Sequence, residues 1–167
     1  MVTVKKILAA STMGALMLAA SGPAGVAMAA VLGPNPTLCD GGTEPSILVR
    51  VSGLKNRAGT IRVRTFTADP GKYFDKRYTL KRLLYPVPAS GPVDICVPVS
   101  APGIYAVDVR HDANNNDDTD RADGVGASGN PKFSLFNIIL GRKPRAEQVQ
   151  VSVGNGTTIV PITVRYL

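Results

Sequence analysis

The stretches SILVRVSGL (46–54) and TIRVRTFT (60–67) decide the fold. Both are rich in β-branched residues, and polar and apolar side chains alternate along them, which is the pattern of a strand with one buried face. Residues 55–59 between them are polar or small and end in Gly59. The pattern predicts that the two strands pair with each other as a hairpin.

Four more alternating or apolar stretches follow, separated by turn residues such as Pro-Gly and Gly-Asn-Gly. They are residues 93–99, 104–110, 148–153 and 158–166. Residues 73–85 could form a short helix or an exposed strand, and residues 132–140 could form a strand or a packed loop. Because strands dominate, we predict an all-β fold: a single antiparallel β-sandwich of about seven strands, of immunoglobulin or transthyretin type.

Residues 1–29 have the features of a cleaved secretory signal peptide. Lys5 and Lys6 give a positive start, residues 7–20 an apolar core, and residues 27–29 (Ala-Met-Ala) a small-x-small cleavage site. The alternative is an uncleaved membrane anchor, which needs about 20 consecutive apolar residues. The apolar core is shorter than that and contains Ser, Thr and Gly. We therefore expect an exported protein, periplasmic or secreted, with no transmembrane segment after cleavage.

Cleavage would leave an extended N-terminal arm at 30–45 and one sandwich domain at 46–167, which is long enough for a single core. Loss of the two signal-peptide lysines lowers the net charge from +7 to +5. For an exported protein this mildly basic balance favours anionic surface polymers or lipid head groups over nucleic acid as partners. A cell-envelope component and another exported protein are both open as partners.

The sequence contains two cysteines, Cys39 and Cys96. An even number in an oxidising compartment favours a disulfide between them. In the chain-entropy model, closing a loop of this length contributes about 4 kcal/mol to stability. The alternative, two thiols for metal or redox chemistry, has no CxxC pair and no neighbouring histidine to support it.

The densest polar stretch lies directly after the predicted strand 104–110. With Asp112 as position 1, oxygen-bearing side chains fall at the positions used by EF-hand-like calcium loops. They are Asp112, Asn114, Asn116, Asp118, Asp120 and Asp123. Asp117 stands at position 6, where glycine is usual, and Asp123 replaces the usual bidentate Glu. The alternative is a solvated turn whose Asn and Asp side chains bond their own backbone.

His111 is the only histidine, which is too few for a zinc or copper site. A hydrolase would pair it with a nucleophile such as Ser128 and an acid such as Asp108 or Asp112. No nucleophile motif accompanies these residues. We therefore predict no catalytic residues and keep a hydrolase that uses His111 as an alternative.

The glycine-rich stretch GVGASG (124–129) spells a dinucleotide-binding pattern. That pattern needs a strand before it and a helix after it, whereas here an acidic loop precedes and Asn130-Pro131 follows. We expect a turn of glycines.

Basic and aromatic residues are interleaved between positions 72 and 85. The basic members are Lys72, Lys76, Arg77, Lys81 and Arg82. They suit phosphate or acidic sugar, so a module that binds anionic glycan or lipid is a further alternative, and a solvated rim is the competing interpretation. Arg142, Lys143 and Arg145 form a smaller cluster with the same two interpretations.

Several of these stretches together resemble the exported bacterial proteins of the family called domain of unknown function 2141. The resemblance rests on VSGL (51–54), GTIRV (59–63), PGIYAV (102–107) with HDANNN (111–116) behind it, GASGNP (126–131) and VPITVRY (160–166). It implies an exported β-sandwich and no established activity. From the residues themselves we expect a non-enzymatic binding or structural module whose acidic loop binds calcium, with no other cofactor.

Overall fold

The structure, a computed structural model, describes residues 30–132 and 142–166. Its strands are β1 Ser46–Ser52, β2 Thr60–Thr67, β3 Lys81–Pro86, β4 Val93–Pro98, β5 Gly103–Asp112, β6 Gly124–Ala127, β7 Val151–Val153 and β8 Thr157–Thr163. The helical segments are the 3-10 turns η1 Pro36–Cys39 and η2 Lys76–Tyr78 and the single-turn helix α2 Ala146–Val149. Within these two ranges no helix has the length and apolar character needed to cross a membrane.

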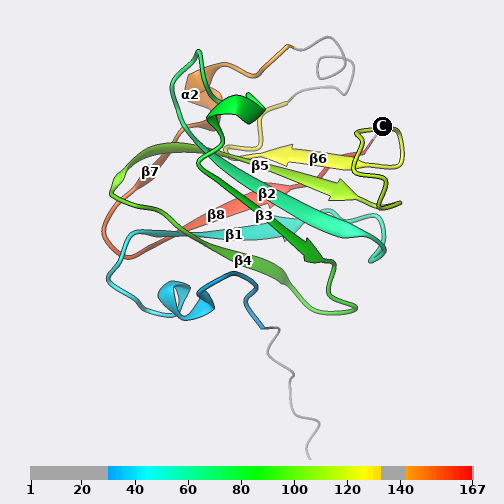
Figure 1. Ribbon diagram of the computed structural model, residues 1–167, viewed down its shortest axis with the longest axis horizontal. Helices are drawn as coiled ribbons and strands as arrows, with labels where there is room; N and C mark the ends of the chain where they lie inside the picture. Colours follow the sequence, from blue (N-terminus) through cyan, green and yellow to red (C-terminus); the bar gives the residue numbers. More distant parts are fainter. Residues whose placement is uncertain (1–29, 133–141, 167) are drawn as a thin grey trace, which may run out of the picture.

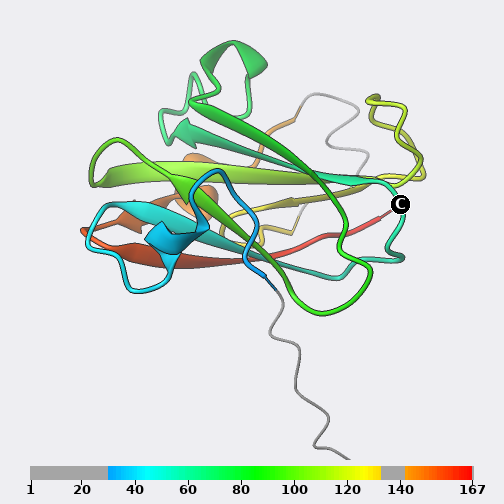
Figure 2. The ribbon, with the colours of Figure 1, turned by 60° about the horizontal axis from the view of Figure 1, so that its bottom comes forward.

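The strands form two sheets that face each other. One sheet has the order β4-β1-β8, and the other has the order β3-β2-β5-β6 with β7 also pairing with β5. Figure 2 shows the sheets as two layers, and in Figure 1 the five-stranded sheet lies in front. The predicted β-sandwich is therefore confirmed. The prediction of a purely antiparallel arrangement needs one correction, because β1 pairs with β8 in parallel.

The predicted hairpin between residues 46–54 and 60–67 is wrong. β1 pairs with β4 and β8 in one sheet, whereas β2 pairs with β3 and β5 in the other. The connection crosses between the layers through Gly53 and Gly59, whose φ values of +77° and +74° lie in the left-handed region that favours glycine. Alternation of polar and apolar residues did not distinguish the two arrangements, because it fixes which face is buried and not which strand pairs alongside.

The main core lies between the sheets and is built by alternate residues of the facing strands. It includes Ile47, Val49 and Val51 of β1, Ile61 and Val63 of β2, Val107 and Val109 of β5, and Val160 and Ile162 of β8. Burial of each such side chain contributes about 1.5 to 3 kcal/mol. Because successive side chains point to opposite faces of a sheet, the residues between these on β2 and β5 lie on the outer face of the five-stranded sheet.

The N-terminal arm is tied to the edge strand β4 at two points. Leu32 forms an isolated parallel bridge with Ile95, and Cys39 is bonded to Cys96 with the two Cα atoms 5.8 Å apart. The predicted disulfide is confirmed. The arm is not extended throughout, because η1 turns the chain and ends at the disulfide residue Cys39. The predicted signal peptide at 1–29 lies outside the described residues.

The strand β6 was not predicted from the sequence pattern, and it raises the strand number to eight. Gly124 and Gly126, read as part of a turn, are strand residues paired with β5. A Cβ on Gly124 would lie 2.3 Å from Cγ1 of Val164, and one on Gly126 would lie 2.6 Å from Cγ2 of Ile162. These glycines are present for close packing against the last strand rather than for a turn.

The structure shows the conformation of residues 73–85, one of the two ambiguous stretches, and of the predicted strand 148–153. Residues 73–85 contain both η2 and β3, so helical and strand character occur in succession. Residues 148–153 contain the end of α2 before β7. Of residues 132–140, nearly all lie outside the described part of the chain.

Candidate functional site

The acidic loop, defined as residues 112–123, connects β5 to β6 at one end of the five-stranded sheet (Figure 1). Asp112 is the last residue of β5 and Asp123 directly precedes β6, so the two strands hold both ends of the loop. Both of these side chains are buried, whereas Asn114, Asn116 and Asp118 are exposed. The six predicted ligands are therefore divided between a buried base and a solvated tip.

Arg110 organises the first half of the loop. Its buried guanidinium donates from Nη2 to Oδ2 of Asp112 at 3.2 Å and to Oδ1 of Asp117 at 2.7 Å. Its Nη1 donates to the carbonyl oxygen of Asp117 at 2.8 Å. This side chain places a positive charge between two carboxylates and so performs part of what a bound cation would do.

The tip of the loop converges on Asp120. Asn114 and Asn116 each donate from Nδ2 to Oδ2 of Asp120, at 2.9 and 2.8 Å. The bond from Asn114 is the largest of several contributions that lower the pKa of Asp120 below its usual range. Three of the six predicted ligands, Asn114, Asn116 and Asp120, therefore meet at one point. The two asparagines face Asp120 with their amide nitrogens rather than their oxygens.

Asp123 is the less satisfied of the two buried carboxylates of the loop. Its Oδ1 accepts a hydrogen bond from the backbone N–H of Ala113 at 3.3 Å, and its buried Oδ2 has no partner among the described residues. Burial raises the pKa of Asp123, and the charges of Asp112 and Asp120 act in the same direction. An unpaired buried acceptor of this kind is costly unless a proton or a cation reaches it.

The backbone of the loop also bears on the calcium hypothesis. Asp117, at position 6, has φ +58°, the left-handed conformation for which calcium loops normally use glycine. Among residues 30–132 and 142–166, however, no three His, Cys, Asp or Glu side chains are grouped closely enough to hold a metal ion. Calcium binding stays a prediction.

His111 points into the sandwich and both of its ring nitrogens are engaged. Nε2 donates to the carbonyl oxygen of Ala58 at 2.6 Å, and Nδ1 is bonded to the hydroxyl of Tyr166. Because a carbonyl only accepts, the proton is on Nε2 and the Tyr166 hydroxyl donates to Nδ1 in the neutral ring. These bonds join β5 to the end of the chain.

The structure does not bring together the residues of the hydrolase alternative. Asp108 and Asp112 lie on the outer face of the sheet, opposite to His111, and are paired with Arg64 and Arg110. Ser128 is buried elsewhere, where its Oγ accepts from the backbone N–H of Val107 at 3.0 Å and donates to the carbonyl oxygen of Val149 at 2.5 Å.

Comparison with known proteins places this sandwich in a family. The family model described as "uncharacterized protein conserved in bacteria (DUF2141)" matches residues 49–161. The chain belongs to this family. No curated protein and no solved structure matches it. A bacterial family and a Cys39–Cys96 disulfide are together typical of an extracytoplasmic protein.

The DUF2141 match runs from β1 into β8 and so includes the acidic loop and both strands that hold it. It extends over the stretches on which the resemblance was based, apart from the last residues, and that assignment is confirmed. The family description carries no activity, so any function must be argued from the residues of the fold.

The basic segment 72–82 of this DUF2141 protein is largely paired with acids. Lys72 contacts Asp69 at 3.3 Å, Arg77 contacts Asp75 at 2.6 Å, and Arg82 contacts Asp117 at 3.4 Å. Lys76 and Lys81 are exposed. The charges of this segment are spread over η2 and β3 rather than directed at one point, which favours the solvated-rim interpretation.

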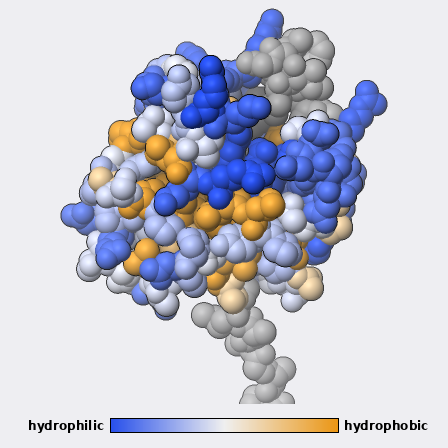
Figure 3. All heavy atoms as spheres, in the orientation of Figure 1, coloured by the Kyte–Doolittle hydropathy of each residue, from blue (hydrophilic) through white to orange (hydrophobic). Residues whose placement is uncertain are grey.

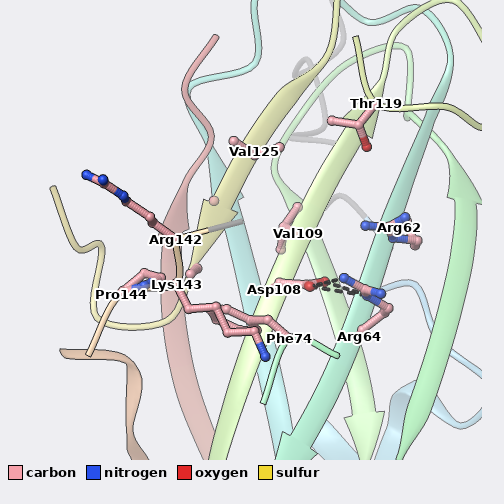
Figure 4. Close-up of a pocket in the computed structure, with 12 residues that line it drawn as sticks. Arg62, Arg64, Phe74, Asp108, Val109, Thr119, Val125, Arg142, Lys143 and Pro144 are labelled. Carbon is pink, nitrogen blue, oxygen red and sulfur yellow. Dashed lines mark hydrogen bonds and ion pairs between the residues drawn. The ribbon is translucent and has the colours of Figure 1, made fainter. Parts of the chain in front are cut away.

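A second group of charged residues, which the sequence pattern did not reveal, lies on the outer face of the five-stranded sheet. The register pairs Arg62 of β2 with Arg110 of β5, and Arg64 with Asp108. Arg62, Arg64 and Asp108 line a pocket of about 240 Å³, together with Arg142 and Lys143 of the second basic cluster (Figure 4). The alternation Arg-x-Arg in β2 was visible in the sequence, but its cross-strand partners were not.

Proposed function

We propose that this protein is an exported, non-enzymatic module that acts by binding, and that its acidic loop is a calcium site. The observation that carries the cation site is Asp123, whose buried Oδ2 lacks a partner among the described residues. Calcium is the cation of choice, since it takes six to eight hard oxygen ligands from carboxylates, amides and water. Export is supported by the sequence of residues 1–29 and by the disulfide.

The loop would have to adjust to receive the ion. Turning the amides of Asn114 and Asn116 would replace their Nδ2 donors with oxygen ligands around Asp120, and Asp118 is free to approach from the exposed tip. Arg110 competes for Asp112. A site that must reorganise against a resident arginine is expected to be weak, in the range of about 10⁻⁴ to 10⁻³ M that extracellular calcium modules use.

Binding rather than catalysis is supported by His111. Both of its ring nitrogens are engaged in bonds that hold Ala58 and Tyr166 against β5. The carboxylates that could assist it lie on the opposite face of the sheet, as described above. A residue with these bonds serves the packing of the sandwich.

The test is thermal unfolding of the oxidised protein, purified after export, in calcium, in magnesium and in chelator. For a dissociation constant of about 10⁻⁴ M, 10 mM calcium should stabilise the protein by about 2.7 kcal/mol, or roughly 5 to 10 °C. Asp123→Asn should abolish this shift, and the control Asp69→Asn, outside the loop, should keep it. Equal shifts with magnesium and calcium, or none with either, would reject the site.

A further inference from the structure

Four arginines lie side by side on the outer face of the five-stranded sheet. Arg82 of β3 is in register with Arg64 of β2, and Arg62 of β2 is in register with Arg110 of β5. Figure 3 looks onto this face and shows a strongly hydrophilic band across its middle with hydrophobic side chains beside it. Such a row of like charges is stable only if acids or ligands compensate it.

Three of these arginines have an acid partner. Arg64 donates from Nε to both carboxylate oxygens of Asp108 at 3.1 Å. Arg110 holds Asp112 and Asp117 in the acidic loop, and Arg82 contacts Asp117 from the other side. The acids of this face are therefore already taken.

Arg62 has no such partner. Among the described residues nothing accepts a hydrogen bond from it, and its Nε is buried. Burial lowers the pKa of Arg62 to about 10; Asp108 opposes this effect, while Arg64, Arg110 and Arg82 add to it. The guanidinium is nevertheless ionised at neutral pH, so this partly buried cation has no hydrogen-bonded acid among the described residues.

This cation lines the pocket of about 240 Å³ seen in Figure 4. Arg62 and Arg64 lie on one wall, Asp108 lies on the strand between, and Val125 of β6 lies on the opposite wall with Lys143 and Pro144 (Figure 4). Phe74 closes the pocket at one end. The pocket is smaller than the roughly 300 to 1,000 Å³ of sites for drug-sized ligands, so it suits a small molecule.

We infer that this pocket binds a small organic anion, with its carboxylate or phosphate group on Arg62 and its apolar part against Phe74, Val125 and Pro144. A guanidinium matches both oxyanions, because its parallel N–H groups can donate to two oxygens at once. The apolar wall distinguishes an organic anion from a bare inorganic ion. Thr119 of the acidic loop and Phe74 of the segment 72–82 also line this pocket. The anion is assigned to Arg62 and the calcium ion to the carboxylates of the loop, so the two proposals depend on different residues and can fail independently.

One substitution separates a role of Arg62 in binding from a role in folding. Arg62→Gln removes the repulsion from three neighbouring arginines and the burial of a charge, so the folded protein should be as stable as the wild type or more so. The same substitution removes the charged donor of the ligand. Loss of binding without loss of stability is the signature of a residue that serves a ligand rather than the fold.

The experiment is an NMR titration of the exported, oxidised protein with phenyl phosphate, benzoate, inorganic phosphate and uncharged benzyl alcohol. We expect phenyl phosphate or benzoate to shift signals of β2 and β6, inorganic phosphate to bind more weakly, and benzyl alcohol not to bind. Arg62→Gln should weaken anion binding by roughly tenfold or more. Arg62→Lys, which keeps the charge and loses the planar fork, should fall between.

The matched control is Lys81→Gln, which removes the same charge from an exposed position on neighbouring β3. It should leave the affinity within about twofold, because exposed charges act weakly through solvent. The proposal is overturned if Arg62→Gln, shown to be folded, binds as well as the wild type. It is also overturned if Lys81→Gln loses as much affinity as Arg62→Gln, or if benzyl alcohol binds as well as the anions. Absence of binding by all of the anions at 10 mM would overturn it too, since this concentration is roughly tenfold above the Kd of a weak, 1 mM site.

Discussion

Arg62 and Arg110 face each other across β2 and β5, yet their surroundings differ completely. Arg110 is buried and donates from both terminal nitrogens to Asp112, Asp117 and Thr119, with its Nε alone unpaired. Arg62 is partly buried and donates to none of the described residues. The comparison teaches that a charge on the outer face of a β-sandwich can have two roles: Arg110 holds a loop, and we propose that Arg62 binds a ligand.

The largest expected effect comes from removing Arg110, the arginine that has acid partners. Arg110→Met leaves the buried carboxylate of Asp112 without its cation, which should lower the free energy of unfolding by about 3 kcal/mol. Urea unfolding of the purified protein measures this loss. The control Arg82→Met removes an exposed arginine that also contacts Asp117, and it should change stability little. A loss below about 1 kcal/mol for Arg110→Met would mean that the loop does not depend on this pair.

A smaller effect is expected when the acid nearest the pocket is neutralised. Asp108→Asn removes the partner of Arg64 and the one carboxylate that raises the pKa of Arg62. Two charges about 4 Å apart interact by at least about 1 kcal/mol, so removing the carboxylate that lines the same pocket as the bound anion should strengthen binding by roughly fivefold or more. Calorimetric titration with phenyl phosphate tests this. Unchanged or weaker binding would place the anion away from Arg64 and Arg62.

The smallest effect concerns the pH dependence of the acidic loop. The pKa of Asp123 is raised in the folded protein, so between its ordinary value of about 4 and the raised value the folded state holds more protons than the unfolded state. This group therefore makes stability fall as the pH rises through that window. Asp123→Asn should remove the effect and stabilise the protein more at neutral pH than near pH 4, as urea unfolding at both pH values would measure. An equal change at both would contradict the assignment.

A structural feature of this protein could be predicted from the sequence where it depends on residues close together along the chain. It could not be predicted where it depends on contacts between distant residues. The alternation of polar and apolar residues located β1, β2, β4, β5 and β8, because burial of one face of a strand produces this pattern within the strand itself. It failed for β6, where Gly124 and Gly126 are required by Val164 and Ile162, which lie in β8 or just after it and are distant along the sequence. It also failed for the β1–β2 hairpin, because two strands that bury the same face carry the same pattern in one sheet or in two.

The same distinction between local and long-range information applies to the candidate sites. The acidic loop was located correctly after a strand, since its residues are contiguous, but the strand β6 that follows it was predicted to be a turn. Its control by Arg110 was not foreseen, because that contact depends on which face Arg110 occupies. Arg62 could not be singled out at all, since its lack of a partner in the described part of the chain results from the register of β2 against β3 and β5.

The most direct test of the central claim is the free energy of unfolding of the wild type and Arg62→Gln, each measured with and without 10 mM phenyl phosphate. We predict that the ligand stabilises the wild type and leaves Arg62→Gln unchanged, while Arg62→Gln without ligand is at least as stable as the wild type. Equal stabilisation of both proteins by the ligand, or a loss of stability in Arg62→Gln without ligand, would contradict the account of Arg62 as a cation kept for binding.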